Sequence, residues 1–388
     1  MDATSSPTET TSTHVINPRR WLALGVICAG ELMIVLDGTI VTVALPQIKE
    51  GLDFGDTGLA WTLNAYLLTF GGLLLLAGRA ADLIGPRRLF VSGLGIFTVA
   101  SLICGLATHA WMLVAARALQ GVGGAIITAV ALALLVINFP EPQERAKAMG
   151  IWTFVAAGGG SIGVTLGGVL TDALDWRWIF LVNLPVGIAA IIMTMRSLAP
   201  DPTTREGTLD VAGAILATGA STLLVAAFVG VESAGWASAR TIGLLAGSLI
   251  LIGAFIVVER RVAHPLLPAG VFRSRNLTAG CLVSVLTIIG LFGWFFIGTL
   301  YVQRVLGHDP LTTGLTFLPA TLLLGGMSMG PSAKLVRRFG PKPPLVVGTA
   351  MTAIGLVLMA RAPVGGRILV DVMPAMILIG IGIGISFM

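Results

Sequence analysis

Residues 111–137 read WMLVAARALQGVGGAIITAVALALLVI, an apolar run with a single charged side chain, Arg117. A helix that crosses a bilayer needs about 20 consecutive apolar residues, and this run exceeds that length. The stretch therefore predicts a transmembrane helix that carries an arginine inside the membrane.

The same pattern recurs on both sides of this run and predicts twelve spans in all. Their approximate limits are 21–45, 60–78, 89–107, 111–137, 148–171, 178–195, 211–231, 241–258, 277–302, 313–333, 344–360 and 369–388. The first run is too long for the core of a signal peptide, so we expect a retained helix after a polar tail, residues 1–20. The predicted fold class is an all-α membrane protein.

The composition of the 388-residue chain agrees with this fold class. Hydrophobic residues make up 55% of it and charged residues only 11%, whereas a soluble domain has about 25% charged residues. A water-soluble enzyme and a disordered chain are therefore excluded. The 50 glycines are typical of closely packed membrane helices.

The net charge of +5 lies in the loops and points to a membrane surface, not to a nucleic acid. If the N-terminus is cytoplasmic, the loops on that side carry 17 of the 24 Lys and Arg residues and the opposite loops carry six, with Arg117 left over. This bias predicts a cytoplasmic N-terminus.

Enzymatic and metal chemistry are not predicted. The loops are too short for a catalytic domain, and the chain lacks the GxxxxGK[ST] phosphate loop of an ATP-driven pump. The histidines lie in tail or loop positions without metal-ligand spacing. The three cysteines, Cys28, Cys104 and Cys281, lie inside apolar runs and predict neither a disulfide nor a metal site.

Three ionisable residues stand out within predicted spans, at a cost of roughly 2.5–3.5 kcal/mol each: Glu31, Asp37 and Arg117. At 1.5 Å per residue, Asp37 lies about 12 Å and Arg117 about 9 Å below the outer ends of their helices. We therefore predict that they face each other or a shared aqueous cavity. Glu31 lies about 120° around the helix from Asp37 and points elsewhere, and Gln120 shares the face of Arg117.

A buried carboxylate that alternates between protonation and pairing with arginine can couple a proton to a conformational change or to a substrate. The alternative is that Arg117 reaches the outer headgroups while the acids form a static ion pair. For Gln120 an interhelical hydrogen bond is as plausible as a functional role.

Glycines are concentrated in the fifth run, at positions 150, 159, 163, 167 and 168. Gly159, Gly163 and Gly167 repeat every fourth residue and form a smooth stripe on one helix face. The stripe predicts close helix packing or, alternatively, a sliding surface between two halves of the molecule.

A short internal repeat joins two loops. Residues 78–88, GRAADLIGPRR, resemble residues 333–342, AKLVRRFGPK, and Gly85-Pro86-Arg87 aligns with Gly340-Pro341-Lys342. Parallel repeats of this kind occur in transporters built from two six-helix bundles. Asp82 is the one acid among the arginines of the first loop, which favours a specific turn over a simple positive anchor.

Together these segments resemble the major facilitator superfamily, specifically its fourteen-helix drug:proton antiporters of the EmrB/QacA type. Four motifs carry the resemblance: residues 36–46 (LDGTIVTVALP), Gly78 with residues 82–88 (DLIGPRR), residues 117–121 (RALQG) and residues 176–187 (WRWIFLVNLPVG). They occur in the family's order and at matching helix positions.

The resemblance implies a secondary transporter of the bacterial plasma membrane, monomeric, that exports small amphipathic or cationic drugs in exchange for protons. The proton motive force replaces any cofactor, and the expected partners are the bilayer, the substrate and protons. Asp37, Arg117, Glu31 and Gln120 would carry coupling. The cytoplasmic gate would comprise Gly78, Asp82, Gly85, Arg87 and Arg88. The alternatives are an exporter of one metabolite or antibiotic, a uniporter or importer, and a non-transporting fragment or scaffold.

The sequence departs from the family pattern in three ways. Val164 stands where the fifth-helix motif has proline, so we expect the proline bend to be lost. Thr42 replaces an asparagine of the first-helix motif. The third departure is length. The family's fourteen helices divide into six, two linking and six helices, whereas this chain has twelve predicted spans.

On this plan the major facilitator fold has a six-helix bundle over 21–195, two linking helices within 196–276 and an incomplete second bundle of four helices over 277–388. We therefore expect a chain about two helices short. A twelve-helix protein divided six and six is the alternative. However, the aligned loops 78–88 and 333–342 each follow the second helix of a half only if two linking helices intervene.

Overall fold

The computed structural model describes residues 18–198, 201, 210–262, 265–266, 274–328 and 330–387, and within these ranges the regular structure is entirely helical. The first part of the chain forms α1 (Arg20–Gly51), α2 (Asp56–Ile84), α3 (Pro86–Gly105), α4 (Ala110–Asn138), α5 (Pro142–Ala173), α6 (Trp178–Leu181) and α7 (Asn183–Ser197). The rest forms α8 (Val211–Ala234), α9 (Ala239–Glu259), α10 (Arg275–Leu300), η2 (Tyr301–Val305), α11 (Pro310–Ser328), α12 (Pro331–Phe339), α13 (Lys342–Ala360), η3 (Ile368–Val372) and α14 (Met373–Phe387).

Among the described residues, ten helices are long and apolar enough to cross a membrane, or eleven if the two stretches of α5 form one span. The chain is therefore a multi-pass membrane protein. The predicted run 313–333 is wrong at its end, because α11 stops at Ser328 and a separate basic helix, α12, begins at Pro331. An apolar composition that continues across a helix break explains this error.

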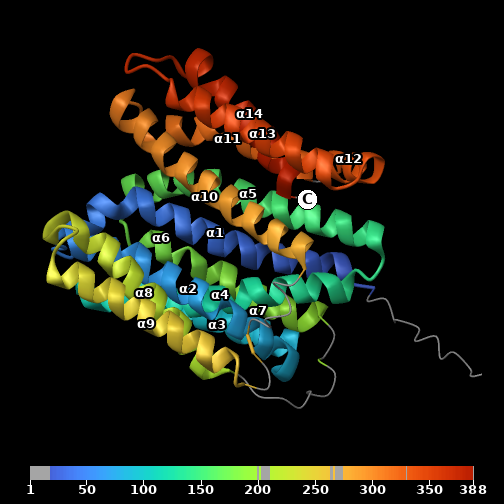
Figure 1. Ribbon diagram of the computed structural model, residues 1–388, viewed down its shortest axis with the longest axis horizontal. Coiled ribbons are helices and arrows are strands. Elements are labelled where there is room, and N and C mark those ends of the chain that lie inside the picture. The colour runs from blue at the N-terminus through green and yellow to red at the C-terminus, as the bar shows by residue number, and fades with distance from the viewer. Residues whose placement is uncertain are drawn as a thin grey trace, which may run out of the picture.

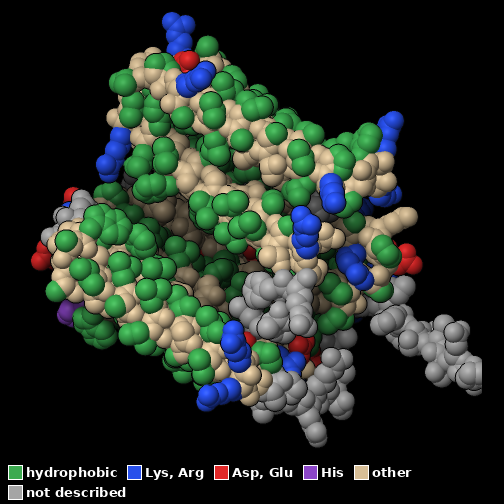
Figure 2. Space-filling model, viewed as in Figure 1, with side chains coloured by type: hydrophobic (Ala, Val, Ile, Leu, Met, Phe, Trp, Pro, Cys, Tyr) green, Lys and Arg blue, Asp and Glu red, His purple; other side chains and the backbone are tan. Residues whose placement is uncertain are grey.

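The helices lie in two bodies joined along one line of contact (Figure 1). In the first body α4 packs between α2 and α3, and α1 packs on α5. The α8–α9 pair packs against α2, and α10 to α14 form the second body, drawn orange to red. The closest packing between the two bodies is that of α5 against α11. Figure 2 shows a deep hollow between the α8–α9 pair and the second body.

The internal repeat is confirmed in the backbone. Gly85 joins α2 to α3 with φ of +102°, and Gly340 joins α12 to α13 with φ of +78°. Glycine adopts positive φ without steric cost, and a following proline suits the start of a helix. The segment 78–88 is nevertheless mostly helical, because α2 continues to Ile84 and only Gly85 forms the turn.

The expectation that α5 loses its bend without a proline is wrong. The stretches Pro142–Gly160 and Thr165–Thr171 meet at an angle of 42°. Glycines at 158–160 and 163 flank this point, and helices bend at clustered small residues as well as at proline.

Candidate functional site

A buried polar layer separates two apolar clusters in the first body. One cluster contains Ile34 of α1 and Ile127 of α4, and the other contains Ile40 of α1 and Leu113 of α4. Asp37 and Arg117 lie between these pairs along their helices, and both are 0% exposed. The layer is therefore enclosed by apolar side chains on both sides, where an unpaired charge would be strongly destabilising.

Arg117 contacts three groups, which lie on α1, on α2 and on its own helix α4. Its Nη1 donates to the Asp37 carboxylate and also to Gln120 Oε1 at 2.7 Å. Its Nε donates to the carbonyl oxygen of Thr62 at 3.0 Å. The predicted meeting of Asp37 and Arg117 is confirmed, and the arginine lies in the core instead of extending to the headgroups.

The other carboxylate oxygen of Asp37 accepts from two amides. Gln120 Nε2 donates to Asp37 Oδ1 at 2.6 Å and Asn183 Nδ2 donates to it at 3.3 Å. Gln120 Nε2 also donates to Ser101 Oγ at 2.9 Å. Helices α1, α3, α4 and α7 thus contribute to one network that holds an ion pair in an apolar interior.

Sequence reasoning missed Asn183, Ser101 and Tyr66 as members of this network. Asn183 stands in the 176–187 motif, which was the available signal for it. The Tyr66 ring lies over the guanidinium of Arg117, with its centroid 4.3 Å from Cζ. We find no hydrogen-bond partner for Tyr66 Oη or Arg117 Nη2 among the described residues. Each of these groups can therefore donate a further hydrogen bond.

Glu31 is buried in α1 but does not join this ion pair. Its Oε2 accepts from Thr128 Oγ1 of α4 at 3.3 Å. As predicted, it points away from Asp37, toward a different level of α4. The first body therefore holds two buried carboxylates, one bound to a cation and one bound to a hydroxyl.

The glycine stripe of α5 faces α1 within the same body. A Cβ on Gly159 would lie 3.0 Å from Val35, one on Gly163 would overlap Thr39, and one on Gly167 would lie 3.0 Å from Ile40. Gly150 and Gly168 are buried as well. The stripe therefore allows close packing of α1 on α5, and the alternative of a sliding surface between halves is wrong for these positions.

The predicted gate residues lie at the junction of α2 and α3. Gly78, Arg79 and Asp82 line a cavity of about 360 Å3 together with Thr128, and Arg79 pairs with Asp82 at 3.6 Å. The backbone amides of Arg87 and Arg88, at the start of α3, donate at 2.8 and 2.9 Å to Asp201, which follows α7.

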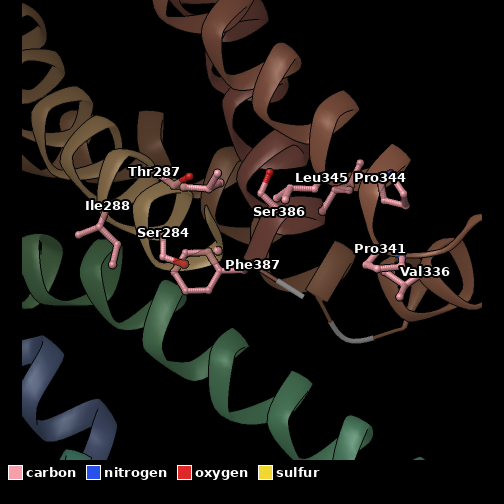
Figure 3. A pocket seen from close by; sticks show the side chains of 12 residues that line it. Ser284, Thr287, Ile288, Val336, Pro341, Pro344, Leu345, Ser386 and Phe387 are labelled. Carbon is pink, nitrogen blue, oxygen red and sulfur yellow. The ribbon is translucent and has the colours of Figure 1, made fainter. Parts of the chain in front are cut away.

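Two further cavities adjoin the second body. One of about 460 Å3 opens between α10 and the α12–α14 group; Ser284, Leu345 and Phe387 border it in Figure 3. The other, of about 190 Å3, lies between the two bodies and is lined by α1 and α5 on one side and by α10, α11 and α14 on the other. Phe387 lines both.

These features define a class: a multi-pass helical membrane protein whose two bodies enclose a cavity and whose first body buries an arginine–carboxylate pair. The chain belongs to the Major Facilitator Superfamily, because the family model of that description matches residues 27–388.

Similar proteins are resistance and export proteins. The chain is 42% identical to the puromycin resistance protein of Streptomyces alboniger, over 100% of this chain and 77% of that protein. It is 39% identical to the cephamycin export protein of Amycolatopsis lactamdurans, over 86% of this chain and 69% of that one. It is 36% identical to the tetracenomycin C resistance and export protein of Streptomyces glaucescens, over 87% of this chain and 63% of that one. The chain thus spans roughly two thirds to three quarters of the length of these relatives.

A solved structure with a similar fold is the proton:xylose symporter XylE bound to a glucose analogue. It matches with a TM-score of 0.62 and 12% sequence identity, over 95% of this chain and 80% of that one. At this identity the likeness concerns the fold alone.

Proposed function

We propose that this chain provides the proton-coupled export of small amphipathic or cationic compounds across the bacterial plasma membrane, with its N-terminus in the cytoplasm. The observation that carries the proposal is the fully buried pair of Asp37 and Arg117, held by Gln120 and Asn183. A charged pair in an apolar interior is expensive, and intramembrane ionisable groups mark proton and substrate pathways.

In the proposed cycle, Asp37 exchanges its bond to Arg117 for a proton. Protonation removes the charge that holds the guanidinium, and Arg117 then depends on Gln120, the Thr62 carbonyl and the Tyr66 ring for its remaining contacts. Asp37 lies on α1, whereas the remaining partners lie on α2 and α4. The exchange therefore releases the bond between α1 and α4 and keeps the contacts of Arg117 with α2 and with its own helix. Glu31 is the second candidate for a proton-carrying group.

The driving force is adequate without ATP. One proton crossing 100 mV supplies about 2.3 kcal/mol. At about 1.4 kcal/mol per tenfold change, this energy sustains roughly a 45-fold substrate gradient.

We further propose the six, two and six plan of the fourteen-helix drug:proton antiporters. Two observations support it. First, α8 and α9 form a separate pair that packs against α2. Second, if this pair is counted as two linking helices, the turns at Gly85 and Gly340 each precede the third spanning helix of a half, α3 and α13. The basic loops, including Arg87 and Arg88, would face the cytoplasm.

The test uses the full chain in sealed vesicles with an imposed pH gradient and a fluorescent amphipathic substrate. Asp37→Asn keeps the shape of the side chain and one accepting oxygen but removes its charge, so we expect gradient-driven accumulation to fall to the level of empty vesicles. Asp53→Asn is the matched control, because Asp53 is exposed at a positive φ of 51°, which asparagine tolerates. Unchanged proton-driven transport in Asp37→Asn would refute the coupling role.

A second candidate function is export of one particular antibiotic. It is favoured by the relatives, whose names refer to single compounds such as puromycin, cephamycin and tetracenomycin C. Cells that express the chain would then tolerate one compound of a diverse panel, whereas a multidrug exporter would raise tolerance to several.

A further inference from the structure

We propose that Glu31 exchanges its proton with water in the cavity of about 360 Å3 between α2 and α4, and that the hydroxyl of Thr128 relays the proton between them. The inference rests on the proposed function and extends it, because it gives the first body a second proton site with a route of its own. That route ends at the α2–α3 junction, on the side that the proposed topology places in the cytoplasm.

One side chain connects Glu31 with this cavity. Glu31 is only 7% exposed, and its Oε2 accepts from Thr128 Oγ1 at 3.3 Å. Thr128 also lines the cavity and is itself half-buried, so it borders the buried carboxylate on one side and the open space on the other. A proton that leaves Glu31 by this path crosses a single hydroxyl group.

The cavity runs from the interior of the first body toward the ends of its helices. Thr128 lies ten residues before Asn138, the last residue of α4, and therefore about 15 Å below that end at about 1.5 Å per residue. Asp82 lines the same cavity only two residues before the end of α2. The space is large enough for several water molecules, since each takes up about 30 Å3 in the liquid. Water can therefore extend from the α2–α3 junction to the level of Thr128.

Charged groups favour water in the outer part of the cavity. Arg79 and Asp82 pair with each other at 3.6 Å and remain partly exposed, with 32% and 55% of their side chains accessible. Of the residues that line the cavity, these two and Thr128 are the ones with polar side chains, and Thr128 lies deepest of the three. Its hydroxyl is therefore the last polar group that a proton meets before Glu31.

The proton transfer needs no group beyond this hydroxyl and water. Thr128 Oγ1 accepts a proton from a cavity water while its own hydrogen passes to Glu31 Oε2, so one O–H bond forms as another breaks and the hydroxyl is restored. The reverse sequence releases the proton to the cavity. Two titratable side chains that interact electrostatically with Glu31, Cys28 of α1 and Tyr66 of α2, do not line the cavity.

This route is separate from the ion pair and from the cavity between the two bodies. Asp37 stands six residues from Glu31, about 9 Å along α1, and its carboxylate is bound within the network of Arg117. The cavity at Thr128 shares no lining residue with the one between the bodies. Glu31 therefore exchanges its proton without breaking the ion pair.

The test follows hydrogen–deuterium exchange at the Glu31 carboxyl by infrared spectroscopy of the purified full chain in lipid nanodiscs, without substrate or gradient. The C=O band of the protonated carboxyl is assigned by its loss in Glu31→Gln. Thr128→Val keeps the shape of the side chain but removes the hydroxyl, so we expect exchange to slow about a hundredfold, the lower range for a positioned proton-transfer group. Thr128→Ser restores the hydroxyl and should exchange at nearly the parent rate. Thr349→Val removes a hydroxyl that donates to Leu345 O of its own helix, α13, and should leave the rate unchanged.

A second pair of variants tests the cavity without changing Thr128. Gly78 lines the cavity, whereas Gly71 lies about two helical turns away on α2 and does not line it. A Cβ at either position would meet nothing within 4 Å. Gly78→Leu fills the cavity and leaves the bond between Thr128 and Glu31 in place, so we expect exchange to slow more than about tenfold. Gly71→Leu should not change the rate.

Exchange at the parent rate in Thr128→Val would overturn the relay, and the same result in Gly78→Leu would overturn the route. Equal slowing in Gly71→Leu and Gly78→Leu would place the water path elsewhere along α2 and reject the proposal too. A carboxyl band that is missing at every pH would show that Glu31 takes up no proton, with the same consequence. Because exchange is measured without transport, persistence of proton-driven transport in Asp37→Asn would reject the proposed coupling role and leave this route standing.

Discussion

The first helices of the two bodies, α1 and α10, have opposite surroundings. In the most apolar stretch of α1, 56% of the residues are buried, against 6% for α10. α1 carries Glu31 and Asp37 and packs on the glycine stripe of α5, whereas α10 has no charged residue after Arg275. Burial and charge occur together in the first body because a membrane-embedded charge needs protein partners on every side.

The two bodies therefore contribute different kinds of residue to the site. The first body holds the ion pair of Asp37 and Arg117 in a hydrogen-bonded network, and the second body contributes aromatic side chains from α10 and α14 to the cavity between them. Each prediction below compares a position in the first body with a control position whose surroundings differ.

The largest effect should come from Arg117→Ala. Asp37 would remain buried without its cation, and breaking a buried pair costs about 3–5 kcal/mol. We expect a large fall in thermal stability in detergent, measured by intrinsic fluorescence, together with loss of transport.

Its matched control is Arg304→Ala in η2, which follows α10; the side chain is exposed and we expect a change within about 0.5 kcal/mol. Restoring neutrality with Asp37→Asn in the Arg117→Ala background should recover part of the stability but none of the proton-driven transport. If both arginine variants were equally stable, the contrast between the two bodies would be wrong.

The second comparison concerns the two glycine turns. Both have positive φ, but a Cβ on Gly85 would lie 2.5 Å from Cγ of Asp201, while one on Gly340 meets nothing within 4 Å. Gly340→Ala should cost about 1 kcal/mol from backbone strain alone, and Gly85→Ala about 3 kcal/mol from strain and overlap.

Adding Asp201→Gly should reduce the cost of Gly85→Ala toward that of Gly340→Ala, as measured by a thermal-stability cycle. Equal costs for the two alanine variants in the parent background would mean that Asp201 does not approach Gly85.

Sequence patterns predicted the helices and the charged pair because both follow from simple physics. Apolar runs of span length are helical in a membrane, and the depths of Asp37 and Arg117 followed from the helix rise. The break between α11 and α12 was missed because the apolar run continues across it.

The remaining site residues depend on tertiary packing. Ser101 and Asn183 carry short neutral side chains, which membrane helices tolerate in many places. Only the packing of α3 on α4 and of α7 on α1 gives them their roles. Likewise, the period of the glycine stripe shows that Gly159, Gly163 and Gly167 share a face. It does not show which helix that face meets.

The third prediction tests this stripe. In Gly163→Ala the new methyl group would overlap Thr39 and lie 3.2 Å from the carbonyl oxygen of Leu36, so we expect a loss of about 2 kcal/mol by overpacking. Gly158→Ala on the same helix and Gly293→Ala on α10 meet nothing within 4 Å. Both controls should be neutral or slightly stabilising, since alanine favours helix. If either control were destabilised as much as Gly163→Ala, close packing at the stripe would not explain the loss.

The smallest effect is expected at the starts of the two third helices. Asp201 accepts from the backbone amides of Arg87 and Arg88 at the start of α3, while α13 begins at Lys342 without a side-chain cap. Loss of a cap costs about 1 kcal/mol, so in Asp201→Ala we expect amide hydrogen exchange over the first turn of α3 to accelerate about fivefold. Asp201→Asn keeps an accepting oxygen and should accelerate it less. The amides of Lys342 and Leu345 in the first turn of α13 serve as the internal reference, because α13 has no side-chain cap to lose. A uniform change in both turns would show that Asp201 acts on global stability and not on the α2–α3 junction.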